Sequence, residues 1–89
     1  ANVMPTANIY NIVYKIDGID NIHNVRTRGT TSNVYIDMHM VVSSDLTVKE
    51  AYQKACLVKK NLIDEYEEVK DVIIQIESEE GIYDAKDLK

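Results

Sequence analysis

A two-residue alternation over residues 33–42 is the feature that most constrains the fold of this chain. Alternate side chains of a strand point to opposite faces of a sheet, whereas a helix repeats every 3.6 residues. The side chains that would share one face are apolar: Val34, Ile36, Met38, Met40 and Val42. The opposite face would carry Tyr35, Asp37 and His39. The pattern predicts a strand with one face in a hydrophobic core.

A helix and another strand follow this segment. Thr47-Val48-Lys49-Glu50 is a capping box, which starts a helix. The apolar positions that we expect this helix to bury are Val48, Ala51, Tyr52, Ala55, Leu62 and Tyr66. Residues 71–77 alternate again, with Val72, Ile74 and Ile76 on one face and Ile73, Gln75 and Glu77 on the other. A strand, a helix and a strand in this order predict a parallel crossover.

The first thirty residues add a helix and a strand. Residues 5–15 predict a helix, because Ile9, Ile12, Val13 and Ile16 are spaced so that they share one helical face. Asp17-Gly18 is the signal that ends this helix. Residues 21–28 predict a strand that a turn at 29–32 joins to the next. The order α-β-β-α-β predicts an α+β, ferredoxin-like two-layer sandwich, with a three-stranded mixed sheet and two helices on one face. We expect one domain over 1–80 and a flexible C-terminal tail over 81–89.

The other face of this sheet has no predicted cover. It would carry Tyr35, Val41, Ile73 and Gln75, a partly apolar set. A sheet face of this kind usually needs a partner. We therefore predict that these four residues form the interface of a homodimer.

Composition excludes several classes of function. The net charge of −5 argues against nucleic-acid binding, which depends on lysine and arginine. Cys56 is the only cysteine, so there is no disulfide and no thiolate metal site; we expect it to be a small buried residue. No apolar run approaches the roughly 20 residues that span a bilayer. The chain has no nucleophile motif and no glycine-rich phosphate loop, so we do not expect an enzyme.

His23 and His39, the only histidines, lie on the two predicted hairpin strands. Imidazole and carboxylate together suit zinc, iron(II) or manganese(II). The candidate ligands are His23, Asp37, His39, Glu77 and Glu79. Strict alternation across a four-residue turn would pair Ile22 with His39 and place His23 on the core face. A bulge or a looser turn is needed to bring the two rings together; otherwise both histidines are ordinary polar strand residues.

Four segments resemble the C-terminal cytoplasmic domain of cation diffusion facilitators, which are proton-coupled exporters of zinc, iron and manganese. They are G-I-D-N-I-H-N-V-R-T-R at 18–28, Y-I-D-M-H-M at 35–40, T-V-K-E-A-Y-Q-K-A at 47–55 and D-V-I-I-Q-I-E at 71–77. The resemblance implies a domain at the cytoplasmic face of a membrane, attached to its own transmembrane domain. It implies a V-shaped homodimer that metal closes to activate transport. His23, His39 and Glu77 match positions that bind metal in zinc exporters.

Two features depart from this pattern. Gln75 and Tyr52 stand where the family commonly has histidines. The Tyr35-x-Asp37 pair is similar to the aromatic-x-aspartate of magnetosome members, whose metal sites use that aspartate and an acidic position near Glu79. This similarity favours an iron-handling magnetosome or inner-membrane transporter. Two alternatives stay open: a metal-independent dimerisation or protein-docking module, and a small-molecule sensor of the ACT type.

Overall fold

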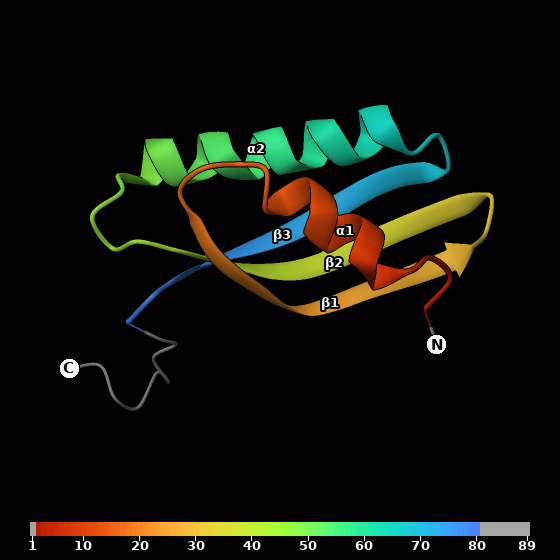
Figure 1. The fold of residues 1–89 in the computed structure, drawn as a ribbon, viewed down its shortest axis with the longest axis horizontal. Coiled ribbons are helices and arrows are strands. Elements are labelled where there is room, and N and C mark those ends of the chain that lie inside the picture. The colour runs from red at the N-terminus through yellow and green to blue at the C-terminus, as the bar shows by residue number, and fades with distance from the viewer. Residues whose placement is uncertain (1, 81–89) are drawn as a thin grey trace.

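Two helices cover one face of a three-stranded sheet in the computed structural model, which describes residues 2–80 (Figure 1). The elements are α1 (Thr6–Val13), β1 (Ile19–Thr30), β2 (Asn33–Val42), α2 (Val48–Glu65) and β3 (Val69–Ser78). This order confirms the predicted α+β sandwich of ferredoxin-like type. The expected tail at 81–89 lies outside the described residues.

The sheet has the order β1-β2-β3, so β2 is central and the other two strands are edges. β2 pairs antiparallel with β1 and parallel with β3. The hairpin and the parallel crossover predicted from the sequence are therefore both present. Alternation along β2 puts Val34, Ile36, Met38, Met40 and Val42 under the helices and leaves Tyr35, Asp37, His39 and Val41 on the open face.

The core lies between the helices and the inner face of the sheet. Side chains with no or almost no exposure come from every element except β3: Ile9, Val13, Ile22, Val34, Ile36, Met38, Met40, Val58 and Leu62. At about 25 cal/mol per Å² of buried apolar surface, such residues supply most of the stability of a domain of this size. The predicted burial of Ile9, Val13 and Ile16 is confirmed, whereas Ile12 is only half-buried. The helix is shorter than predicted: α1 ends at Val13, and Ile16 follows it.

The second helix begins as predicted and buries Ala51, Ala55 and Leu62 as expected, but two other expected residues are exposed. The Thr47 hydroxyl accepts from the Glu50 backbone N–H at 3.1 Å, and the Glu50 carboxylate accepts from the Thr47 N–H at 2.9 Å. The expected burial of Val48 and Tyr52 is wrong, since they are 89% and 64% exposed. Both side chains stand beside the free edge of β3, where no other element of residues 2–80 covers them. Cys56 is also exposed, contrary to expectation.

The turn between β1 and β2 is shorter than predicted. β1 continues to Thr30, which pairs with Asn33, so only Thr31 and Ser32 form the turn. Gly29 lies within the strand at φ +101°, and a Cβ there would come within 2.1 Å of the Asn33 carbonyl oxygen. A side chain at residue 29 would therefore clash, and the glycine permits the tight reversal.

Candidate metal centre

A β-bulge in β1 determines where His23 points. From the two-residue turn, the register places Arg26 opposite Asp37. If this register continued without interruption towards the start of β1, His23 would lie opposite Met40, on the core face. Instead, Asn24 and Val25 together stand opposite the single residue Met38, and His23 pairs with His39. The extra residue shifts the register by one position and moves His23 to the open face.

Asn24 makes this bulge possible. Its φ of 52° lies in the left-handed region, and it is the only non-glycine residue of the described chain there. Asparagine adopts this conformation more readily than most residues, because its short polar side chain can bond locally. Of the two alternatives that the sequence left open, the bulge is the one present, and strict alternation, which would pair Ile22 with His39, is not: Ile22 pairs with Met40 and is buried.

The third strand brings a carboxylate to the two histidines. Glu77 pairs with Val41 in the parallel register and so shares the open face with His39. One carboxylate oxygen, Oε1, lies 2.6 Å from His23 Nε2, and the other, Oε2, lies 2.6 Å from His39 Nδ1. The ligand atoms of the three residues all lie within 4.8 Å of one another. β1, β2 and β3 thus contribute one residue each to a single cluster.

Glu77 is buried, with 8% of its surface exposed. Burial alone raises the pKa of its carboxyl, but the hydrogen bond from His23 and the adjacent His39 imidazole lower it by more. The net result is a pKa of Glu77 below its ordinary value. The ionised carboxylate can only accept, so His23 donates to it through Nε2–H.

His39 has an unsatisfied nitrogen in this cluster. Its Nδ1 is buried and close to Glu77, yet the contact lacks hydrogen-bond geometry, and the atom has no other partner. A buried polar atom without a partner is costly in an ordinary sheet. A metal ligand explains the position of this atom, because a metal would take the lone pair of Nδ1.

Gln75 and the ring packing complete the surroundings of the carboxylate. Gln75 Nε2 donates to Glu77 Oε2 at 3.3 Å, the oxygen that faces His39. The two imidazole rings meet edge to face with their centroids 4.9 Å apart. Gln75 thus touches the carboxylate and does not join the ligand atoms themselves, a role typical of residues that orient metal ligands.

The structure places the other two candidate ligands elsewhere. The Asp37 carboxylate accepts two hydrogen bonds from the Arg28 guanidinium, at 2.8 and 3.3 Å. Glu79 accepts from the backbone and hydroxyl of Ser44 beyond the end of β3. Neither residue belongs to the three-residue cluster, which is the one metal-type cluster within residues 2–80. Sequence alternation placed Asp37, His39 and Glu77 on one face, but it could not identify the side-chain partners of Asp37 and Glu79.

The cluster fits a divalent transition metal. In a zinc tetrahedron, bonds of about 2.1 Å separate the ligand atoms by about 3.4 Å. The two contacts of 2.6 Å, one to each Glu77 oxygen, would need to widen by about 0.8 Å, and a pair of ligand atoms at the 4.8 Å limit would need to approach by about 1.4 Å. Two imidazoles and one carboxylate would leave at least one coordination position open. The donor set suits zinc, iron(II) and manganese(II) better than calcium, which prefers oxygen ligands.

The predicted interface residues surround this centre. Tyr35 and Ile73 are 42% and 57% exposed, Gln75 is exposed, and Val41 is half-buried. The β2–β3 register places all four on the same face as His39 and Glu77. The metal cluster and the apolar residues therefore form one continuous surface, the open face of the sheet.

A family model described as the cytoplasmic domain of cation efflux proteins matches residues 5–79. A search of curated proteins gives no match. No helix within residues 2–80 combines the length and the apolar character needed to cross a bilayer.

Solved structures of the same fold agree with this family. The metal-bound C-terminal domain of the CzcD transporter from Thermotoga maritima is 22% identical, with a TM-score of 0.80 over 85% of this chain and 88% of that one. The cytosolic domain of a cation diffusion facilitator family protein is 23% identical, with a TM-score of 0.78 over 84% and 89%. A nickel form of the MamM C-terminal domain is 15% identical, with a TM-score of 0.75 over 82% and 92%.

Proposed function

This chain belongs to the cation efflux proteins as a cytoplasmic domain of that family, and we propose that it senses metal and dimerises to regulate divalent-cation export. The observation that carries the proposal is the convergence of His23, His39 and Glu77 from three strands, with one imidazole nitrogen buried and unsatisfied. These three residues would hold the metal. Zinc fits this donor set best, and iron(II) and manganese(II) are the alternatives to test.

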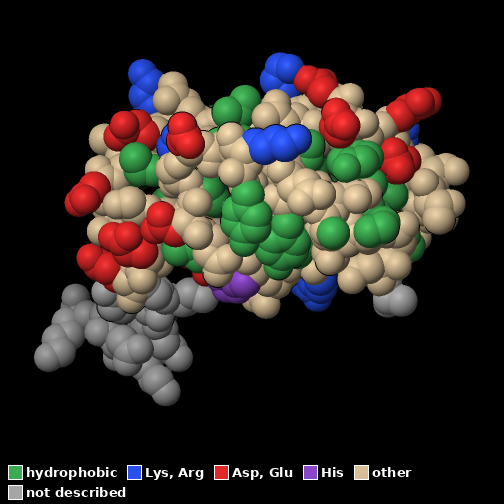
Figure 2. Space-filling model, in the orientation of Figure 1, with side chains coloured by type: hydrophobic (Ala, Val, Ile, Leu, Met, Phe, Trp, Pro, Cys, Tyr) green, Lys and Arg blue, Asp and Glu red, His purple; other side chains and the backbone are tan. Residues whose placement is uncertain are grey.

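The regulatory step would be a change in how two copies pack. The open face, with Tyr35, Val41, Ile73 and Gln75, would form the dimer contact. Acidic side chains gather at the end of the molecule where α2 begins (Figure 2), and the chain carries a net charge of −5. Two such copies repel each other, so a divalent cation bound at the open face would favour a closed dimer. It can do so only by binding the closed form more tightly than the open form.

In the complete transporter, this domain would act from the cytoplasmic face of the inner or a magnetosome membrane. It would pass its closure to the attached transmembrane domain, which would exchange the exported cation for protons. Asp37 is paired with Arg28 in the present structure, which favours a zinc-type site over the magnetosome arrangement that uses that aspartate. No chemistry on an organic substrate is proposed, since the family is one of transporters.

Isothermal titration with zinc and with manganese, combined with small-angle scattering on the same samples, tests the proposal. We expect saturable binding and a smaller radius of gyration with metal, both lost in His39→Ala. The matched control is Asp37→Asn, which changes an open-face carboxylate outside the cluster and should leave both signals in place. Dimerisation without any metal binding would refute metal sensing and support a metal-independent docking module.

A further inference from the structure

The three-residue cluster leaves a bound metal short of ligands. His23, His39 and Glu77 supply one ligand atom each, whereas a zinc-type ion takes four or more. Within residues 2–80, no further histidine, cysteine or carboxylate belongs to the cluster. The remaining ligand would therefore come from solvent, from a small molecule or from another chain.

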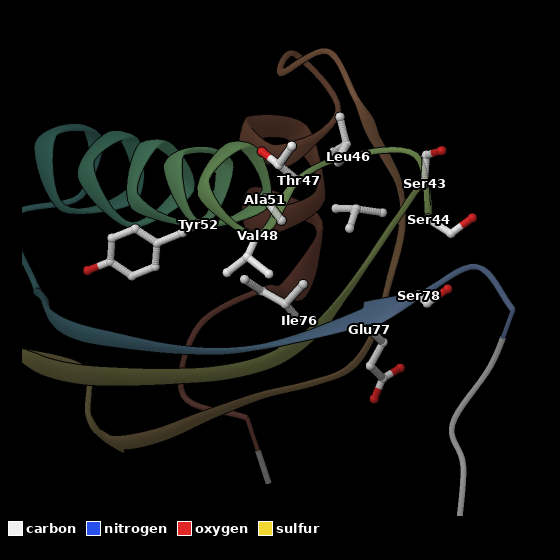
Figure 3. Close-up of a pocket in the computed structure, with 11 residues that line it drawn as sticks. Ser43, Ser44, Leu46, Thr47, Val48, Ala51, Tyr52, Ile76, Glu77 and Ser78 are labelled. Carbon is white, nitrogen blue, oxygen red and sulfur yellow. The ribbon is translucent and has the colours of Figure 1, made fainter.

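Two cavities adjoin residues of the cluster, on opposite faces of the sheet. One, of about 430 Å³, lies between the start of α2 and β3 (Figure 3). The Glu77 carboxylate points away from the apolar Val48 and Ile76 side chains of this cavity, to the other side of β3. The other cavity, of about 370 Å³, lies on the open face, and its lining residues are Asn24, Arg26 and His39. A small molecule would reach the metal from this second cavity.

Arg26 brings an unpaired positive charge to the second cavity. It stands opposite Asp37, which makes it a diagonal neighbour of His39, at the 7–8 Å that a long side chain can bridge. The Asp37 carboxylate is bound by Arg28 instead. Arg26 is exposed and forms no ion pair with any residue of the described chain. Its guanidinium is therefore free to bind a ligand of the metal.

The charges around the open coordination position favour an anion. A divalent metal beside the ionised Glu77 keeps one net positive charge, and Arg26 adds a second. A carboxylate has two oxygens, one for the metal and one for the planar guanidinium. The nearby Asp37 and Glu77 carboxylates would repel an ion of higher negative charge more strongly. A small carboxylate is therefore the ligand that fits this position best.

We propose that Arg26 and a metal held by the cluster together bind a small free carboxylate. One carboxylate oxygen would fill the open coordination position, and Arg26 would donate to the other. The domain would then bind metal and anion as a ternary complex, in which each raises the affinity for the other by the same factor. This inference rests on the proposed metal site and names its remaining ligand. Arg26 belongs to β1, outside the four residues of the predicted dimer contact.

Cobalt(II) in place of zinc provides a direct measurement, because its visible absorption changes when one of its ligands changes. The chain is loaded with cobalt in a buffer without coordinating anions and then titrated with sodium acetate. We expect a saturable spectral change in wild type. Arg26→Gln should weaken acetate binding about tenfold or more, the usual effect of losing a charge-assisted hydrogen bond. The matched control is Lys60→Gln, which removes a positive charge from α2 on the other side of the sheet and should bind acetate like wild type.

The affinity for cobalt itself separates this role of Arg26 from a structural one. Without acetate, Arg26→Gln should bind cobalt at least as tightly as wild type, because the substitution removes a positive charge near the cation. Weaker cobalt binding by Arg26→Gln in the absence of acetate would show a structural role and overturn the proposal.

The same titrations distinguish failure of this inference from failure of the metal site. Cobalt binding by wild type without any response to acetate would overturn the inference and leave the metal site in place. Absence of cobalt binding would refute both. Cobalt affinity that rises with protein concentration and does not respond to acetate would also overturn the inference, and would assign the remaining ligand to a second copy.

Discussion

Replacing Glu77 with glutamine is the most informative perturbation of the metal centre. The amide keeps the size of the side chain but removes the charge and one acceptor oxygen from between His23 and His39. At a free zinc concentration of about 100 times Kd, binding to the native state adds about 2.7 kcal/mol of stability. For a domain of 60–100 residues, each kcal/mol raises Tm by about 4–8 °C. Wild type should therefore gain about 10–20 °C with zinc.

Thermal unfolding followed by circular dichroism, with zinc and with a chelator, measures this gain. Glu77→Gln should lose most of the zinc-dependent increase in Tm while still folding in chelator. Glu79→Gln is the matched control, because this glutamate is two residues away and bonds to Ser44. The reasoning would be refuted by a Glu77→Gln variant that keeps the full increase, or by a control that loses it.

Four further predictions concern the parts of the fold that position the site. Thr47→Ala removes the helix cap and should cost about 1 kcal/mol in urea unfolding. Hydrogen bonds from the Thr47 backbone and hydroxyl lower the pKa of Glu50. The stability that the Glu50 carboxylate contributes is therefore complete above its unfolded pKa and is lost as pH falls through the lower folded pKa. Glu50→Gln should flatten the pH dependence of stability below about pH 5. Asn24→Val should cost about 1–2 kcal/mol of stability and weaken zinc binding, whereas Asn24→Gly should preserve both. Thr27 is buried, and its hydroxyl accepts from the Val3 N–H and donates to Asn2, so Thr27→Val should lower the free energy of unfolding by about 1–3 kcal/mol.

The sequence predicted the elements well because their signals are local. The alternation over 33–42 and the capping box at Thr47 depend on nearest neighbours along the chain, and both are present in the structure. The burial of Val48 and Tyr52 was mispredicted for a different reason. Helical spacing identifies a face, but only the sheet order shows that this face extends past the edge of β3.

The metal cluster could be predicted in its residues but not in its geometry. Residue type made His23, His39 and Glu77 candidates, and alternation placed His39 and Glu77 on the open face, but strict alternation placed His23 on the core face. The distances between the ligand atoms depend on the register of β1, because a single extra residue in that strand turns His23 from one face of the sheet to the other. Asn24 was the available signal, since asparagine tolerates the left-handed conformation that the bulge uses. The pairing of Asp37 with Arg28 is a side-chain contact across strands, and spacing alone does not select it over metal binding.

The arrangement of the ligands couples metal binding to the integrity of the whole sheet. His23, His39 and Glu77 come from three strands, so the cluster exists only when the bulged antiparallel pairing and the parallel crossover are both in register. Metal bound there would stabilise both strand pairings at once, because it would bind the cluster that only the native state forms. A slip of β1 by one residue would turn His23 to the core and leave two ligands. The bulge at Asn24 is therefore the smallest element on which both the pairing of β1 with β2 and the proposed metal response would depend.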